Sequence, residues 1–130
     1  MTLEAAFVAK LGARAELVAL IAARIYPDRL PQGVAYPAVS YRMISNERVS
    51  AFGSDTGLAQ PRYQFDSWAE RKLDAINTSA EVRKALQRWR QDGPPEIQGT
   101  FILSEIDIDD GPEAIFRRSL DVRFIWREGT

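Results

Sequence analysis

Apolar residues recur at helical spacing in two segments of the chain. The first segment covers residues 3–24 and predicts a helix or a pair of helices, because Thr2 can cap its start and Gly12 can divide it. The second covers residues 70–91, and Gly93-Pro94-Pro95 is expected to end it. The apolar stripe of this second helix is predicted to comprise Leu73, Ile76, Val82, Leu86 and Trp89.

Elsewhere apolar and polar side chains alternate, as is typical of strands that are buried on one face. Strands are predicted over residues 39–43, 63–68, 97–108 and 116–126. The first can resume near Val49 after a kink at Ser45-Asn46, whereas the proline-rich residues 27–37 are expected to be irregular. Residues 52–61 are rich in Gly, Ser and Asp, and we expect a long polar hairpin tip there.

The order of these elements is helix, two strands, helix, two strands, with short turns within each strand pair. This order predicts an α+β fold: an antiparallel or mixed sheet of about four to five strands with two main helices packed on one face. With 130 residues the chain is expected to form one domain, residues 1–130. Its start lacks a basic signal segment and charges interrupt its most apolar stretch, so we expect a soluble protein made in the cytoplasm.

Composition narrows the chemistry open to such a fold. Cysteine and histidine are both missing from the sequence, which excludes thiol catalysis, Ser-His-Asp catalysis and most transition-metal sites. Seventeen Lys and Arg stand against eighteen Asp and Glu, and a net charge of -1 argues against a general nucleic-acid binder. The cationic residues are mostly arginines, a bias that suits polar protein interfaces and equally a GC-rich genome.

The best candidate for a metal site is an acidic run over residues 105–113. It contains Glu105, Asp107, Asp109, Asp110 and Glu113. A carboxylate-dependent metal-binding protein that uses Asp107, Asp109 and Asp110 is therefore one alternative. The run lacks the spacing of an EF-hand, because Arg118 stands where that loop requires a bidentate glutamate. We favour a solvated turn or a face that meets basic partners.

Other polar and aromatic patterns have structural interpretations. Arg117, Arg123 and Arg127 share one side of the last strand, but acidic residues interrupt them, which suits salt bridges at a protein interface better than a DNA groove. The three tryptophans are predicted to pack in the core or at its edge. The sequence contains no recognisable nucleophile or phosphate-loop motif.

Five segments follow an Ala- and Leu-rich N-terminal helix in a specific order. They are Arg24–Gly33 (RIYPDRLPQG), Tyr36–Tyr41 (YPAVSY), Gly57–Trp68 (GLAQPRYQFDSW), Val82–Leu86 (VRKAL) and Phe116–Phe124 (FRRSLDVRF). In order and spacing the chain resembles, nearly end to end, the tail completion or tail terminator proteins of long-tailed bacteriophages, prophages and gene transfer agents. Asn77-Thr78-Ser79 departs from the Ala- and Leu-rich helix of that family.

The resemblance implies a structural virion protein at the neck end of the tail, with no enzymatic activity and no cofactor. Such a protein forms a ring, usually a hexamer, that terminates the tail tube and joins it to the head-side connector. The implied partners are further copies of the chain, the major tail tube protein and a connector or stopper protein. DNA would pass through the lumen without specific binding, and no membrane is involved. A head–tail connector or stopper of the same neck region is the alternative.

A ring requires two different, complementary faces on each subunit. Acidic residues grouped at 105–113 and arginines grouped elsewhere could supply them, and the hairpin over residues 46–62 is expected to order on assembly. The predicted interface residues are Arg29, Arg48, Phe52, Asp55, Arg62, Asp107, Asp109, Asp110, Glu113, Arg117 and Arg123.

Overall fold

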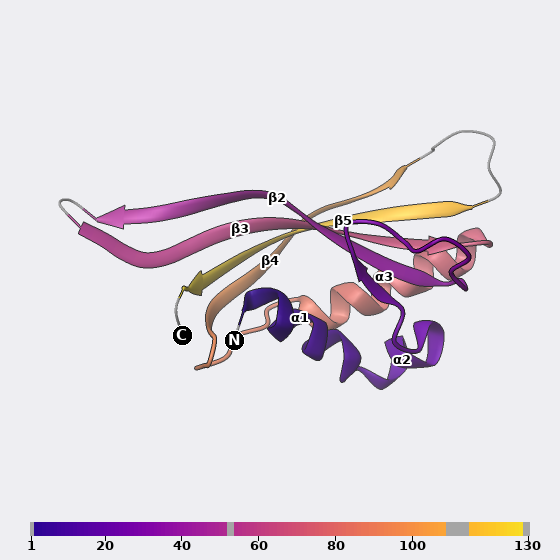
Figure 1. Cartoon of the computed structure of the whole chain (residues 1–130), viewed down its shortest axis with the longest axis horizontal. Helices are drawn as coiled ribbons and strands as arrows, with labels where there is room; N and C mark the ends of the chain where they lie inside the picture. The colour runs from indigo at the N-terminus through magenta and orange to yellow at the C-terminus, as the bar shows by residue number, and fades with distance from the viewer. Residues whose placement is uncertain (1, 52–53, 109–114, 129–130) are drawn as a thin grey trace.

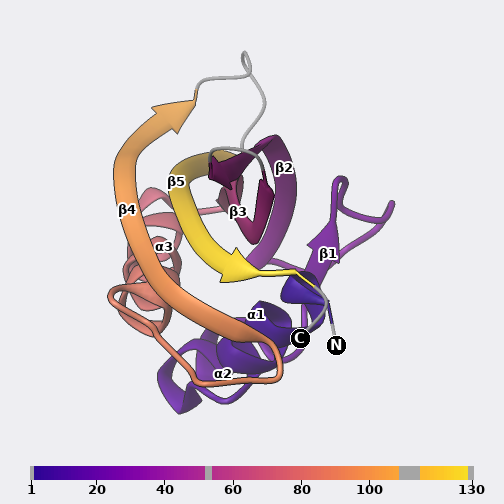
Figure 2. The ribbon, with the colours of Figure 1, turned by 90° about the vertical axis from the view of Figure 1, so that its left-hand side faces the viewer.

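Residues 2–51, 54–108 and 115–128 are described by a computed structural model. The elements along the chain are α1 (Leu3–Gly12), α2 (Ala15–Ile21), β1 (Ile25–Pro27), β2 (Ala38–Ala51), β3 (Ser54–Ala69), α3 (Lys72–Leu86), β4 (Glu96–Ile108) and β5 (Phe116–Arg127). The strands form one sheet in the order β1-β2-β3-β5-β4, in which β1 and β2 are parallel and the other neighbours antiparallel. All three helices lie on one face of this sheet (Figures 1 and 2). The predicted α+β fold with a mixed sheet is confirmed.

The N-terminal segment is a pair of helices. Thr2 has extended backbone angles and its Oγ1 accepts a hydrogen bond from the Ala5 N–H at 3.0 Å, which caps α1 as predicted. The helix ends at Gly12, and α2 begins three residues later at Ala15. Because the chain turns between them, both helices can contact α3.

The hairpin formed by β2 and β3 differs from the prediction. Residues 54–61 belong to β3, and Ala51 pairs with Ser54, so a long polar tip over residues 52–61 is wrong. The composition of residues 54–61 favours a loop, but their backbone hydrogen bonds to β2 hold them in a strand. The expected kink in β2 is present as a register shift between Met43 and Ser45.

β1 is the second difference from the prediction. No strand was predicted at residues 25–27, but Ile25–Pro27 pairs in parallel with Val39–Tyr41, whereas residues 28–37 contain no helix or strand, as expected. Proline is compatible with this strand because β1 lies at the edge of the sheet, where no further strand requires its missing N–H.

α3 is shorter than predicted, and its predicted buried stripe is confirmed in part, because Val82 and Leu86 are buried and Leu73 is not. It ends at Leu86 rather than near residue 91, and Arg88 has a positive φ of 61°. Leu73, expected in the buried stripe, is 58% exposed, whereas Thr78 and Ser79 are fully buried. Small side chains on the buried face allow a helix to approach closely, so α3 continues through Asn77-Thr78-Ser79 without a break.

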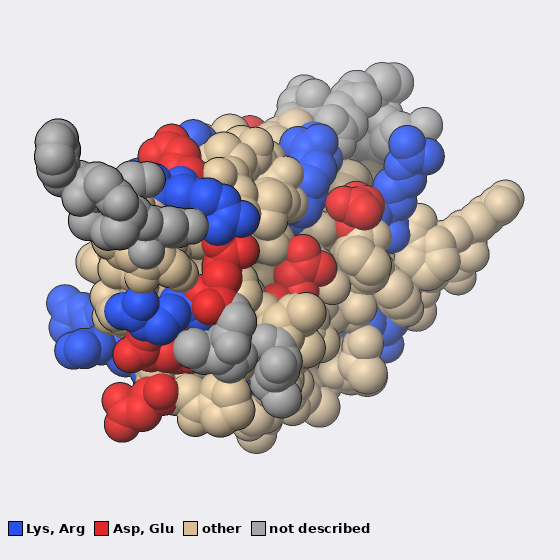
Figure 3. Space-filling model, turned by 60° about the vertical axis from the view of Figure 1, so that its left-hand side comes forward, with Lys and Arg blue, Asp and Glu red and all other residues tan. Residues whose placement is uncertain are grey.

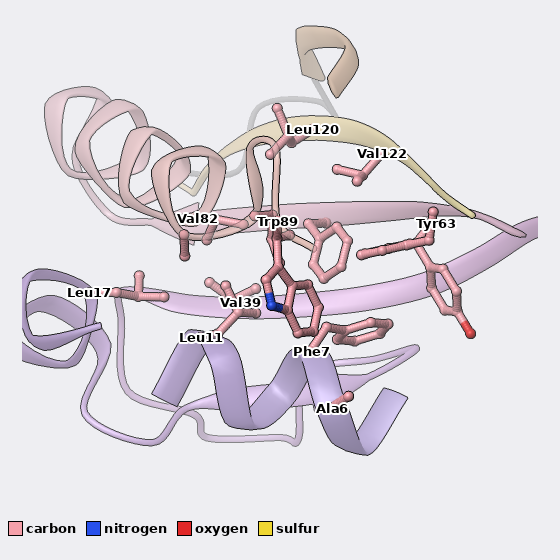
Figure 4. Packing of buried hydrophobic residues seen from close by; sticks show 14 of the residues in the cluster. Ala6, Phe7, Leu11, Leu17, Val39, Tyr63, Val82, Trp89, Leu120 and Val122 are labelled. Atoms are coloured by element: carbon pink, nitrogen blue, oxygen red, sulfur yellow. The ribbon is translucent and has the colours of Figure 1, made fainter. Parts of the chain in front are cut away.

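Phe7 of α1 lies at the centre of the core, between the helices and the sheet. Its ring centroid is 5.0 Å from those of Tyr41 and Tyr63, 5.1 Å from that of Phe65 and 5.5 Å from that of Phe124. Figure 4 shows Phe7 pointing from α1 toward the strands. These contacts fix α1 beneath the middle of the sheet, because aromatic pairs at such distances and angles attract one another beyond their burial.

The sheet has two open edges. β4 forms one edge, and Phe101, Leu103 and Ile106 are exposed along it. At the opposite edge β1 covers only Val39–Tyr41, so residues 42–51 of β2 pair only with β3 in the part of the chain that the structure describes. Met43 and Ile44 are exposed there. Each open edge therefore presents large apolar side chains to solvent.

Candidate interface surfaces

The face of the sheet that carries no helix is lined by a polar network. Val39, Phe65 and Leu120 face the core, so the residues that alternate with them lie on the opposite face. There Trp68 Nε1 donates to Ser40 Oγ at 2.9 Å. The guanidinium carbon of Arg117 lies 4.7 Å from the centroid of the Trp68 ring, a cation–π contact.

The network continues through Asp66. Its Oδ2 lies 3.5 Å from Arg117 Nη1, and Gln64 Nε2 donates to Asp66 Oδ1 at 3.0 Å. Asp66 is buried, so these partners compensate for the desolvation of its carboxylate. The network thus balances charge within the subunit across β3 and β5.

The same face contains a hollow of about 510 Å³. Its lining includes Arg29 and Tyr36 from the segment after β1, Arg42 from β2, Trp68 from β3 and Arg117 from β5. The structure therefore brings together the predicted interface residues Arg29 and Arg117, which are far apart in the sequence. Sequence reasoning missed Trp68, which was expected in or beside the core but lies on this open face.

Arg62 and Arg123 lie directly opposite one another on β3 and β5. Arg62 binds Asp121 with two nitrogens, Nε at 2.9 Å from Oδ1 and Nη2 at 2.5 Å from Oδ2. This pairing raises the pKa of the Arg62 guanidinium and holds it against Asp121. Arg123 is half-buried, and its Nε has no hydrogen-bond partner among the described residues.

Two further arginines of the β2–β3–β5 region are paired within the chain. Arg48 of β2 forms an ion pair with Glu128, just beyond the end of β5. Arg127 Nε donates to Glu96 Oε2 at 2.7 Å, and its Nη1 donates to the carbonyl oxygen of Thr56 at 2.7 Å. These bonds join β4, β5 and the β2–β3 hairpin at one end of the sheet.

The two residues of the acidic run that the structure describes, Glu105 and Asp107, form ion pairs with basic side chains of the same chain. Asp107 accepts hydrogen bonds from Lys72 Nζ at 2.6 Å and from Arg118 Nε at 2.7 Å, and both cations hold the pKa of its carboxyl far below the ordinary range. Glu105 Oε1 lies 3.2 Å from Arg118 Nη1. This cluster lies on the helix side of β4 and β5, where it ties them to the start of α3.

Four predicted residues cannot be placed. Phe52, Asp109, Asp110 and Glu113 lie outside the described residues, and of Asp55 only the backbone position in β3 is described. Within residues 2–51, 54–108 and 115–128, no group of three or more carboxylates is arranged to hold a metal ion. Asp107, the described member of the three proposed ligands, is already bound by two cations.

Charges of both signs are distributed over the surface. Figure 3 shows Lys and Arg interleaved with Asp and Glu on the face that it presents, without a continuous basic patch. In the described residues, no helix combines the length and the apolar character that a membrane span requires. The arrangement offers balanced, polar contact surfaces and two open sheet edges.

Comparisons with known proteins agree with the fold and with one family. The model of the family described as Tail completion protein gp17 matches residues 5–127. A chain from a structure of the "Virion of native gene transfer agent (GTA) particle" superposes with a TM-score of 0.71, at 23% sequence identity, over 96% of this chain and 94% of that chain. At 23% sequence identity this structural similarity shows a shared fold and nothing more. No curated protein matches the sequence.

Proposed function

The chain belongs to the tail completion protein family, and from this premise we propose that it forms a ring, expected to be a hexamer, that terminates the tail tube and joins it to the head-side connector. The family match over residues 5–127 carries the proposal, because it spans nearly the whole chain. As a member of this family the protein is a structural component of a virion tail. Its proposed work is assembly rather than catalysis.

Two arginines of the helix-free face are neutralised within the subunit, which bears on a ring around DNA. On the helix-free face, Arg117 is balanced by Asp66 and Arg62 by Asp121. Phosphate contacts require cations that are free to replace counterions, and cations bound to carboxylates serve this poorly. A lumen lined by such a face would allow DNA to slide past without being held. We therefore expect little DNA affinity at physiological salt.

Assembly tests the proposal directly. We expect native mass spectrometry of the protein with the major tail tube protein to show a closed oligomer, and electron microscopy to place it at tube ends. The protein alone serves as the comparison, because subunits can remain monomeric until they meet a tube. A chain that stays monomeric under both conditions, or that binds the connector and never a tube end, contradicts the proposal.

A further inference from the structure

We propose that neighbouring subunits of the ring join edge to edge, with β4 of one subunit pairing antiparallel to the open part of β2, Arg42–Ala51, of the next. The two five-stranded sheets would then continue into one another around the ring. This inference rests on the proposed function, since it names the surfaces through which the ring closes.

The exposed edge of β4 has the properties of a strand that another strand covers. Leu103, Ile106 and every residue between them are exposed, and Phe101 is exposed as well. In the described residues the start of β4 is covered as far as Thr100: Gln91 and Ile97 exchange backbone hydrogen bonds of 3.1 and 2.9 Å, and the Arg88 N–H donates to the Thr100 carbonyl oxygen at 3.3 Å. An open edge strand that exposes large apolar side chains is a template for pairing with another chain.

The open part of β2 offers a second, different edge. It continues beyond the three residues that β1 covers, and its first residues, Arg42, Met43 and Ile44, are exposed. A cyclic assembly requires such a heterologous contact, in which one surface of each copy meets another surface of the next. One sheet with two unlike open edges meets that requirement.

The distribution of charge favours pairing of β4 with the neighbour's β2 over pairing of two β4 strands. The exposed stretch of β4 carries Glu105 and Asp107, so pairing of two β4 strands would bring acidic residues together across the joint. The open part of β2 carries Arg48 on the same face of the sheet as Glu105 and Asp107, and Arg42 and Glu47 on the other face. The occupant is therefore a second copy of this chain, docked through its β2 edge.

Strand direction also fits a ring. Three successive antiparallel pairings separate β2 from β4, so these strands run in opposite directions within one subunit. Rotation about an axis that lies roughly along the strands preserves their directions. The joint between β4 and the neighbour's β2 is then antiparallel, which is the more stable of the two ladder geometries.

The register of the joint can be estimated from the sheet. Ile102 lies level with Met43 through Val122 and Tyr63, so the two open segments are displaced along the strands. Five strands about 4.8 Å apart, tilted by about 35–45° as in closed barrels, displace neighbouring sheets by roughly 17–24 Å, or about five to seven residues. Within one subunit Glu47 lies level with Gly99 through Gln60 and Ile125, so in one of its two senses this displacement places Glu47 opposite residues 105–107 of the neighbour.

Engineered disulfides test the joint cleanly, because the sequence contains no cysteine. We expect mild oxidation of assembled Glu47→Cys/Ile106→Cys protein to give a ladder of linked oligomers on a non-reducing gel, because both residues lie on the helix-free face of the sheet. β2 and β4 of one subunit are three strand spacings apart, about 14 Å, which is too far for an internal bridge. Glu47→Cys/Leu73→Cys is the control, since Leu73 lies on α3, and it should give no ladder.

A charge substitution tests the joint without relying on its register. Ile106→Lys places a lysine on the β4 edge, and we expect it to reduce the fraction of assembled ring by at least about tenfold. Leu73→Lys is the matched control, because Leu73 is 58% exposed and Ile106 57% exposed. Both variants should fold like the parent by circular dichroism, and Leu73→Lys should assemble like it.

The outcomes separate this inference from the proposed function. Rings that form equally well with Ile106→Lys and yield no ladder overturn the edge joint and leave the ring intact. A dimer that forms from Ile106→Cys alone, in place of the ladder, overturns it in favour of pairing between two β4 strands. A parent protein that never forms a ring, with or without tube protein, overturns the proposed function and this inference together.

Discussion

Replacing Phe7 with alanine should cost the domain much of its stability. The side chain is fully buried and lies within 5.5 Å, centroid to centroid, of four other rings. Phe→Ala changes in cores cost about 3–5 kcal/mol, and lost ring pairing favours the upper part of that range. We therefore expect a loss of about 4 kcal/mol from a total that is about 5–15 kcal/mol for small domains.

Urea denaturation followed by tryptophan fluorescence measures this loss. Trp89 is a suitable reporter because it is buried and its ring centroid lies 6.4 Å from that of Phe124. With a slope of about 2 kcal/mol per molar urea, the midpoint should fall by about 2 M. The slope itself should stay unchanged, since the same surface is exposed on unfolding.

The matched control is Phe101→Ala on the β4 edge, where the same side chain is 50% exposed. It should cost less than about 1 kcal/mol in the isolated subunit. If Phe7→Ala is no more destabilising than Phe101→Ala, then α1 does not hold Phe7 against the sheet and the description of the core is wrong.

Three further predictions concern polar contacts. Lys72 and Arg118 depress the pKa of Asp107, so the stabilisation that its charge provides is present above the ordinary carboxyl pKa of about 3.9 and declines as pH falls below it. Asp107→Asn should thus cost up to about 1 kcal/mol at pH 7, and urea midpoints should show a smaller gap at pH 3; an equal gap at both refutes the pairing. A double-mutant cycle of Arg62→Ala and Asp121→Ala should give a measurable stabilising coupling, and a coupling near zero contradicts the two-nitrogen geometry. Thr78→Val should leave stability unchanged or raise it by about 1 kcal/mol in thermal unfolding, because the buried hydroxyl has no partner among the described residues; a clear loss would show that it has one.

The sequence predicts the fold where local pattern is decisive. In β5, Leu120, Val122 and Phe124 alternate with polar residues, and all three face the core as expected. α1 has a capping threonine at its start, and its cap was correctly predicted. Such signals depend on neighbouring residues alone, so they remain valid whatever the rest of the chain does.

The errors arise where distant contacts decide. Residues 54–61 look like a loop by composition, yet pairing with β2 and the bond from Arg127 to Thr56 place them in a strand. In α3 the sequence favours large side chains such as Leu73 for the buried face. Thr78 and Ser79, which are fully buried, occupy this face instead.

The candidate interface surfaces were partly predictable. Family resemblance directed attention to arginines and acidic residues, and Arg29 and Arg117 do line one hollow. The stacking of Arg117 on Trp68 had no local signal, because it depends on the register between β3 and β5. The open edges were equally hidden, since the order of strands in a sheet cannot be inferred from alternation alone.

Two unlike open edges on one sheet also affect how assembly would proceed. Every incomplete arc of subunits retains one free edge at each end, whereas a closed ring has none. The final contact joins two ends of the same arc, so it forms at a high effective concentration and adds a joint without the cost of capturing another subunit. Populations of monomers and complete rings should therefore dominate, with partial arcs scarce, and a finished ring should exchange its subunits slowly.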